Sequence, residues 1–284
     1  ITSFNSDGYT FEDGVTNGVV FNNNGNNYTS WNWKAGGGQG SSNTDGSINT
    51  TYTSVNTTAG FSICKWAGSG ANATIGHGLG VAPKMVITKS LGSSAWGVYH
   101  ESLGNTKVLF LDTTAGESAN VAYWNNTSPT STVFSVGTDS SVNHSGNDMI
   151  AYCFAEKKGY SKFGSYTGNG NVDGTFVYTG FKPAWVMIKG SGSTGNYYSW
   201  SIFDTTRQTF NVNAGKTLYA NRNYEEGKRG QGTASTTIPA IDMLSNGFKC
   251  RVLNDEVNTT TSYVFMAFAE EPIVGSNNIP ATAR

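Results

Sequence analysis

Short apolar runs alternate with polar positions along most of the chain, and Gly, Asn, Ser or Pro bounds each run. Runs of this kind predict β-strands, whereas no segment keeps the apolar period of about 3.6 residues that a helix needs. We therefore expect little helix. Between residues 59 and 157 the predicted strands are Phe61–Trp66, Ala73–His77, Lys84–Lys89, Trp96–His100, Lys107–Leu111, Val121–Trp124, Val133–Val136 and Met149–Ala155.

Residues 158–273 carry a second series of such runs in a similar order. Short strands at regular spacing are typical of a β-sandwich or jelly roll. The fold class that we predict is all-β, with two tandem sandwich modules at 59–157 and 158–273. The strands of the second module are Lys162–Tyr166, Gly174–Tyr178, Ala184–Lys189, Ser199–Phe203, Lys216–Ala220, Ile241–Leu244, Gly247–Leu253 and Ser262–Ala269.

The two modules repeat each other. Trp66–Lys89 and Tyr166–Lys189 share glycines and a proline in one register, and these residues mark backbone conformations that others tolerate poorly. A fixed register of this kind indicates an internal duplication. Only Glu156–Tyr160 separates the last strand of the first module from the second, so we expect the modules to pack rigidly. The residues that recur one hundred positions later are Gly68, Gly70, Gly80, Pro83, Val86 and Lys89.

The first 36 residues read as the closing strands of a further unit upstream. Ile1–Gly8 is similar to Ile241–Gly247, and Tyr28–Trp33 is similar to Tyr263–Phe268. Turn formers between the apolar positions suggest β-hairpins here. We therefore expect this chain to be the C-terminal part of a longer protein.

Two further segments lack a strand pattern. Residues 37–58 are rich in Gly, Asn and Thr and contain few large apolar side chains, a composition that favours a linker or an extended arm. Residues 274–284 are assigned as a C-terminal tail. The second module also carries an insertion at Asn221–Gly230, the densest charge cluster of the chain, which is typical either of a solvated loop or of a contact site.

Composition narrows the class further. Charged residues make up only 13% of the chain and aromatic residues another 13%, which suits a compact β protein. A formal net charge of −1 gives no electrostatic reason to expect nucleic acid or insertion into an anionic membrane. The three cysteines, Cys64, Cys153 and Cys250, lie in strand-like apolar runs and are expected to be buried free thiols.

The chain shows no pattern that predicts an enzyme, a cofactor or a metal. Ala214–Thr217 ends like a phosphate-binding loop, but position 210 is Phe where such a loop begins with Gly. His77 stands between glycines, and a turn explains that better than catalysis. The three histidines lack the spacing of a zinc site. A carboxylate pair for glycoside hydrolysis could be drawn from several residues, with no reason to choose one: Asp112, Glu117, Asp204 and Glu225.

Several aromatic residues stand next to amides or charges. Such a ring can stack on a sugar while its neighbours bind hydroxyl groups, although packing in the core or at an interface is the favoured interpretation for any single ring. The candidate contact residues for a glycan or a protein partner are Trp124, Asn125, Asn126, Tyr197, Tyr198, Arg222, Tyr224 and Glu225.

The duplicated motifs resemble a known class of protein. GFSI…GHGLG, AYCFAE…GYSKFGSYTGNG and LSNGFK…YVFMAFAE.P, running to ATAR at the end, are similar to modules of tail-fibre-like and other virion proteins of marine bacteriophages, including phages of cyanobacteria. The resemblance covers nearly the whole chain. It implies a rigid virion appendage outside the cell that contacts the host surface, and it supplies no catalytic residues.

From the resemblance we expect a tail fibre or spike segment that binds host-surface glycan. The expected partners are other copies of the chain, with a trimer as the first expectation, and other virion proteins. Two alternatives stay open. The chain could instead be a capsid decoration or a subunit of an extracellular filament, with residues 37–58 lying across a neighbour. A polysaccharide depolymerase is the third reading.

Overall fold

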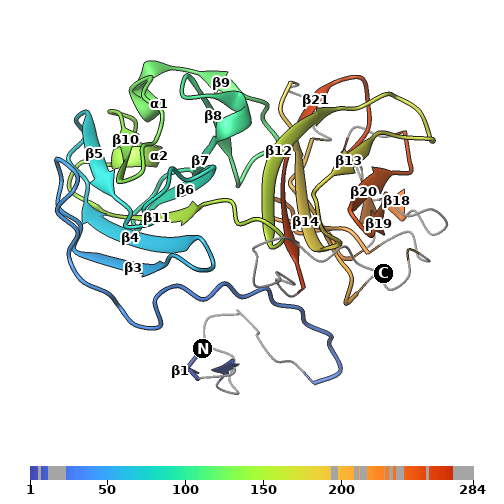
Figure 1. The fold of residues 1–284 in the computed structure, drawn as a ribbon, viewed down its shortest axis with the longest axis horizontal. Coiled ribbons are helices and arrows are strands. Elements are labelled where there is room, and N and C mark those ends of the chain that lie inside the picture. The colour runs from blue at the N-terminus through green and yellow to red at the C-terminus, as the bar shows by residue number, and fades with distance from the viewer. Residues whose placement is uncertain are drawn as a thin grey trace. The chain divides into compact units, whose positions relative to one another are not determined.

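Figure 1 shows the computed structural model, which describes residues 1–5, 8–11, 24–192, 198–207, 211, 216–226, 228–229, 233–234, 240–253 and 256–270. The chain divides into two compact units, Ile1–Trp33 and Lys34–Arg284. In the first unit, β1 (Ser3–Phe4) pairs with β2 (Tyr9–Thr10) as an antiparallel hairpin. Residues 28–33, predicted to close an upstream unit, form no strand.

The first sandwich consists of a large sheet packed against a small one. Within the described residues, the large sheet has seven strands in the order β3-β4-β11-β6-β7-β8-β9 and the small one pairs β5 with β10. Their shared core holds Trp66, Ile75, Val86 and Phe134. The strands are β3 (Tyr52–Asn56), β4 (Phe61–Ala67), β5 (Ala73–Gly76), β6 (Met85–Ser90), β7 (Gly97–His100), β8 (Lys107–Phe110), β9 (Ser118–Ala119), β10 (Val133–Val136) and β11 (Asp148–Phe154).

The second sandwich also pairs a large sheet with a small one. Its described strands form a five-stranded sheet in the order β12-β21-β14-β15-β16 and a three-stranded sheet in the order β13-β20-β19. Tyr166, Val177, Phe248 and Phe265 belong to the core between them. The strands are β12 (Ser161–Thr167), β13 (Phe176–Tyr178), β14 (Pro183–Gly190), β15 (Ser201–Asp204), β16 (Leu218–Tyr219), β19 (Ile241–Leu244), β20 (Gly247–Cys250) and β21 (Ser262–Ala269), with the separate pair β17 (Lys228–Arg229) and β18 (Thr233–Ala234).

The predicted all-β fold class is confirmed, and the two sandwiches share one strand order. When β3 at the edge of the first large sheet is left out of the count, the last strand of each large sheet inserts between the first and the third strand of its sandwich, as β11 does between β4 and β6 and β21 does between β12 and β14. In each small sheet, the second strand of its sandwich pairs with a strand from late in the same sandwich. This common order supports the internal duplication that the sequence predicts. The three cysteines are buried and free, as expected.

Short helices occur where the sequence suggested a strand or nothing regular. The predicted strand Val121–Trp124 is wrong: this segment is the one-turn helix α1. The Asn120 side chain accepts a hydrogen bond from the amide of Ala122, and Asn125 ends the helix in a left-handed conformation with φ 50°. These local caps outweigh the β preference of the apolar run. Two further turns are η1 (Glu101–Leu103) and α2 (Ser140–Asn143).

The predicted arm at 37–58 is in large part a component of the first sandwich. β3 adds to the edge of β4, and Ser41 forms a bridge with Thr53. Farther along, the Ile48 amide donates to the carbonyl of Thr74 in β5 at 3.2 Å. Tyr52–Asn56 is therefore a strand and not a linker, whereas residues 41–51 lie against the sandwich as an extended segment. Unpaired strand edges favour any partner with matching hydrogen bonds, and here the chain supplies that partner itself.

Among the described residues, hydrogen bonds to backbone groups join the two sandwiches, and we call this boundary the seam. The indole of Trp200 donates to the carbonyl of Phe110 at 2.7 Å, and the Lys189 ammonium donates to that of Thr114 at 3.0 Å. The Glu117 amide donates to the carbonyl of Ser191 at 2.9 Å. Finally, His100 Nε2 lies 3.2 Å from the carbonyl oxygen of Phe265, while its Nδ1 accepts from the Ser102 amide. That pair of contacts assigns the proton to Nε2.

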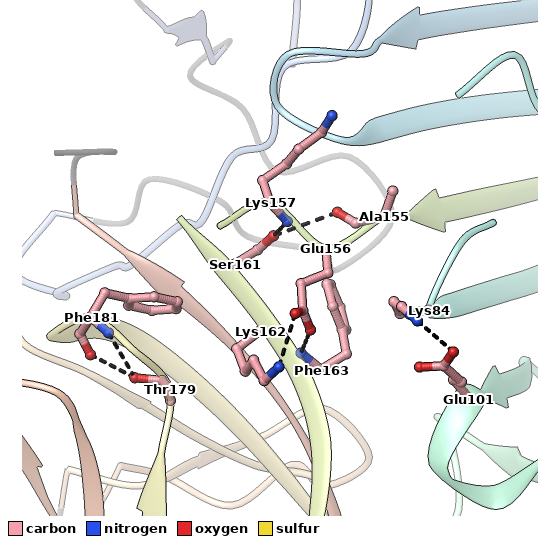
Figure 2. A network of polar contacts seen from close by, with 10 residues as sticks. All are labelled: Lys84, Glu101, Ala155, Glu156, Lys157, Ser161, Lys162, Phe163, Thr179 and Phe181. Atoms are coloured by element: carbon pink, nitrogen blue, oxygen red, sulfur yellow. Dashed lines mark hydrogen bonds and ion pairs between the residues drawn. The ribbon is translucent and has the colours of Figure 1, made fainter. Parts of the chain in front are cut away.

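Aromatic packing and the short connection reinforce the seam. The ring of Phe268 lies 6.2 Å from Phe154 and 6.0 Å from Phe163, so side chains of β11, β12 and β21 meet. Figure 2 shows the connecting segment, where the Glu156 carboxylate accepts from the Lys162 ammonium at 2.9 Å and from the Phe163 amide at 3.2 Å. The predicted rigid packing of the modules therefore has a physical basis in these contacts.

A glycine substitution tests the docked segment 41–56. A Cβ atom added at Gly46 would lie 2.3 Å from the carbonyl oxygen of Thr74. Because backbone rather than a flexible side chain blocks it, we expect Gly46→Ala to lower the free energy of unfolding by about 2 kcal/mol. Gly38→Ala is the matched control, since nothing lies within 4 Å of its Cβ position. Equal denaturant midpoints for the two variants would show that this segment is not docked on β5.

His100 makes stability depend on pH. Burial lowers its pKa from 6.5 to about 4, although the Phe265 carbonyl opposes that shift. Below pH 6.5 the unfolded chain binds the proton first, so stability falls as the pH drops toward 4, by about 1.4 kcal/mol per pH unit from this residue. His77, whose pKa burial also lowers, acts in the same direction. Denaturant unfolding of His100→Asn should show a shallower pH dependence than the wild type, and parallel curves would contradict this role.

Candidate functional site

Trp124 is unavailable as a stacking surface. Its side chain is only 2% exposed, its indole donates to the carbonyl of Lys107 at 3.0 Å, and it meets the ring of Tyr99 edge-on. The glycan-contact prediction is therefore wrong for Trp124, and the alternative of core packing is confirmed. Asn125 is half-buried and Asn126 is exposed, both with positive φ in the turn after α1.

The second candidate pair is only partly described. Tyr197 lies outside the described residues. Tyr198 is half-buried, and its backbone carbonyl accepts from the Lys189 ammonium at 2.6 Å. Its ring lies on the backbone of Gly190, where an added Cβ would come within 2.2 Å of the ring. Tyr198 is thus positioned by β14 next to the seam.

Arg222 connects the remaining candidates into one surface, which we call the Arg222 shelf and define as Ser199, Arg222 and Tyr224. The guanidinium lies over the Tyr224 ring, 5.3 Å from its centroid. Its Nε donates to the Ser199 hydroxyl at 3.1 Å, and one terminal nitrogen lies 3.4 Å from the Tyr224 hydroxyl. Arg222 and Tyr224 are half-buried, and the neighbouring Glu225 is exposed. The sequence predicted these residues separately, and the structure brings Arg222 and Tyr224 beside the Tyr198 segment.

The buried side chain of Glu256 contacts the Arg222 shelf indirectly, through Tyr219. Tyr219 meets the ring of Tyr224 edge-on at 6.1 Å and donates its hydroxyl to the Glu256 carboxylate at 2.6 Å. Glu256 is 2% exposed. Buried polar groups are costly without a partner, so this contact fixes Tyr219 and through it the ring of Tyr224.

Lys189 is a seam residue that also contacts the segment leading into the Arg222 shelf. Burial, and to a lesser degree the charge of Arg222, lowers its pKa from 10.5 to about 7. Its ammonium bonds two backbone carbonyls, those of Thr114 and Tyr198. Lys89, at the matching place in the first sandwich, donates to the carbonyls of Ser90, Gly92 and Ser94. In both sandwiches this lysine therefore binds loop carbonyls, which is a structural role.

Part of the charged insertion belongs to an ion-pair network. Glu226 accepts from Arg207 at 2.9 Å and from Lys216 at 2.8 Å. Arg207 also pairs with Asp204 at 2.6 Å, and the side chains of that pair are 11% and 6% exposed. Such a network holds residues 221–226 against β15 and β16. This end of the insertion is anchored, in contrast to the solvated loop considered from sequence.

Two other features bear on chemistry. His77 accepts the Leu79 amide at Nδ1 and lies 3.2 Å from the Thr130 carbonyl through Nε2, so it stabilises a turn as the sequence interpretation held. In the part of the chain that the structure describes, no group of three or more His, Cys, Asp or Glu side chains is placed to hold a metal ion. The same residues include no helix long and apolar enough to cross a membrane.

Residues 1–272 match a family described as a domain of unknown function (DUF7483). The chain belongs to this family. The match includes the N-terminal unit and the described strands of both sandwiches, so neither sandwich alone corresponds to the DUF7483 domain. No curated protein and no solved structure matches the chain.

Sequence reasoning missed the residues that position the shelf in this DUF7483 chain. Ser199, Tyr219 and Glu256 were not singled out. Tyr219 lies in a predicted strand, so its polar end could have been noticed. No signal in the sequence connects it with Glu256, because 37 residues separate them and only the packing of β16 brings them together.

The buried contact of Tyr219 can be tested against a matched neighbour. Tyr219→Phe removes the hydroxyl that reaches the Glu256 carboxylate, and we expect it to lower the free energy of unfolding by about 2 kcal/mol. Tyr224→Phe removes a half-exposed hydroxyl and should cost less than about 0.5 kcal/mol. Urea denaturation measures both. Similar losses for the two variants would mean that the buried carboxylate does not depend on Tyr219.

Proposed function

We propose that this chain is a structural protein of a phage particle: a segment of a tail fibre or spike that contacts a host-surface glycan. The observation that carries the proposal is the seam. Trp200, Lys189 and His100 each hold a backbone carbonyl of the other sandwich or of the connecting loops. Appendages that transmit force need such fixed joints, because an ordinary interface between domains permits relative motion.

The Arg222 shelf supports a glycan contact. A phenol ring offers an apolar face to a sugar, and a guanidinium offers donors in a fixed plane to its hydroxyl groups. Here both groups are held in place before any ligand arrives, by Ser199 and by the stack itself. Preorganised side chains lose little entropy on binding, which favours even a weak carbohydrate ligand.

The proposed role is non-catalytic. The carboxylates that could have formed a hydrolytic pair have other contacts: Asp204 pairs with Arg207, and Glu117 pairs with Lys107. Asp112 accepts the amide of Trp96 at 3.2 Å. A depolymerase needs two carboxylates facing one sugar bond at a defined separation. These contacts instead give three of the four candidates structural roles.

We place the alternative of a capsid decoration or filament subunit second. It relied on residues 37–58 reaching across a neighbouring subunit. In the structure Ser41 and Ile48 bridge to Thr53 and Ile75 of the same chain. We therefore keep the tail fibre or spike as the proposal, with a homo-oligomer, first of all a trimer, as its assembled form.

Locating the protein on the particle tests the structural part of the proposal. Cryo-electron microscopy of native virions should place its density at a tail fibre or spike. Light scattering of the purified chain at micromolar concentration should show an oligomer. A continuous lattice of this protein over the capsid would contradict the proposal, as would a monomer that binds no host-cell envelope.

Changing the shelf tests the glycan contact. We expect Arg222→Ala/Tyr224→Ala to weaken binding to capsular polysaccharide and lipopolysaccharide from the host by about tenfold or more, because stacking and hydrogen bonding are lost together. Leu91→Ala/Val121→Ala, which changes two exposed apolar residues of the first sandwich, is the control. Pull-down on immobilised polysaccharide measures both. Undiminished binding by the first variant would exclude the shelf.

A further inference from the structure

A second surface of the chain has two exposed aromatic rings on one strand. In β13, Phe176 is 44% exposed and Tyr178 is 64% exposed, whereas Val177 between them is 6% exposed and faces the core. Alternate residues of a strand point to opposite faces, so both rings stand on the outer face of the small sheet. Their spacing along the strand is about 7 Å. The alternation Phe-Val-Tyr in the sequence predicts a strand but does not show which face is open to solvent.

In the first sandwich, the corresponding outer face of the small sheet is covered by another segment of the chain. The His77 amide donates to the carbonyl of Thr132 and the Thr179 amide to that of Asn246, which places Gly76 and Tyr178 at equivalent positions of β5 and β13. This structural match differs by two residues from the hundred-residue register of the sequence. At Gly76, an added Cβ would lie 1.7 Å from the Asn43 side chain, because residues 41–56 cover this face.

Module duplication thus leads to different surfaces. Tyr178 stands where Gly76 accommodates Asn43, so a covering segment could not pack on β13 as it packs on β5. The rings of Phe176 and Tyr178 are exposed to solvent instead. An exposed aromatic pair of this kind indicates a contact surface.

Charged side chains flank the rings in a balanced arrangement. Phe176 is opposite Lys249 of β20, which in turn is opposite Asp242 of β19, so the three side chains share one face. Lys249 pairs with Asp173 at 2.5 Å, and Arg251 pairs with Asp242 at 3.2 Å. The two cations and two carboxylates compensate each other. The surface therefore offers donors and acceptors but no net charge to attract an ionic ligand.

We propose that this face, defined by Phe176, Tyr178, Lys249 and Asp173, binds a neutral polysaccharide. Sugar rings of one chain stack on the two aromatic rings, and their hydroxyl groups bond the ammonium and the carboxylate. Two rings in line suit a chain of linked sugars better than a monosaccharide. The proposal rests on the glycan contact proposed above and adds a site separate from the Arg222 shelf.

Affinity electrophoresis tests this site on the full chain. The gels contain dextran, galactomannan or β-glucan as neutral probes and alginate as the anionic probe. We expect at least one neutral polysaccharide to retard the wild type. Phe176→Ala/Tyr178→Ala should weaken that binding about tenfold or more, since both stacking surfaces are removed. Leu91→Ala/Val121→Ala should leave it unchanged. Circular dichroism and urea midpoints show that the variants are folded.

The outcomes separate the site from the proposed function. If Arg222→Ala/Tyr224→Ala abolishes binding and Phe176→Ala/Tyr178→Ala does not, the β13 site is overturned and the glycan contact stands. Retardation by alginate alone overturns the neutral ligand. If light scattering shows that the β13 variant dissociates an oligomer while binding persists, this face is a subunit interface and the proposal is wrong. If no polysaccharide and no host envelope binds the wild type, the glycan contact itself fails.

Discussion

The placement of the second sandwich depends on one constraint: buried N–H donors that must bond backbone carbonyls across the seam. His100, Lys189 and Trp200 are almost fully buried, and each places an N–H group on a carbonyl oxygen outside its own sheet. A buried polar group without a partner costs more than the bond gains, so these contacts favour one relative placement of the sandwiches. The Arg222 shelf is built directly on this framework, because Ser199 precedes Trp200 and the Lys189 ammonium holds the Tyr198 carbonyl.

The two sandwiches share a strand order and differ at their edges. In the first, residues 41–56 extend the large sheet and cover the small one, and glycines at positions 46 and 76 make that close approach possible. In the second, Phe176 and Tyr178 occupy the corresponding strand with their rings in solvent. In the first sandwich the chain itself therefore covers the outer face of the small sheet. In the second sandwich that face exposes aromatic side chains to solvent. Two sandwiches with one strand order can differ in this way because edge and outer-face positions carry less of the core packing than inward positions do.

Low charge means that the proposed glycan contact depends mainly on short-range interactions. The formal net charge is −1, and the charges of the β13 face are paired with each other. Long-range attraction of an ionic partner therefore contributes little, and shape, stacking and hydrogen bonding decide what binds. The shelf has a cation on an aromatic ring, and the β13 face has two rings beside paired charges. Both arrangements suit a ligand rich in hydroxyl groups.

The sequence by itself determined the all-β class, nearly all the strands of both sandwiches and the buried cysteines, because alternation of apolar and polar residues reports directly which side chains leave water. It misassigned Val121–Trp124, where the cap of Asn120 outweighed the apolar run, and Tyr52–Asn56, whose partner strand β4 lies elsewhere in the chain. It named Arg222 and Tyr224 without showing that Ser199 bonds Arg222, and it left open whether Trp124 is a contact residue or part of the core. Only the tertiary structure decided those points, since burial and side-chain contacts between distant segments depend on how the sheets pack.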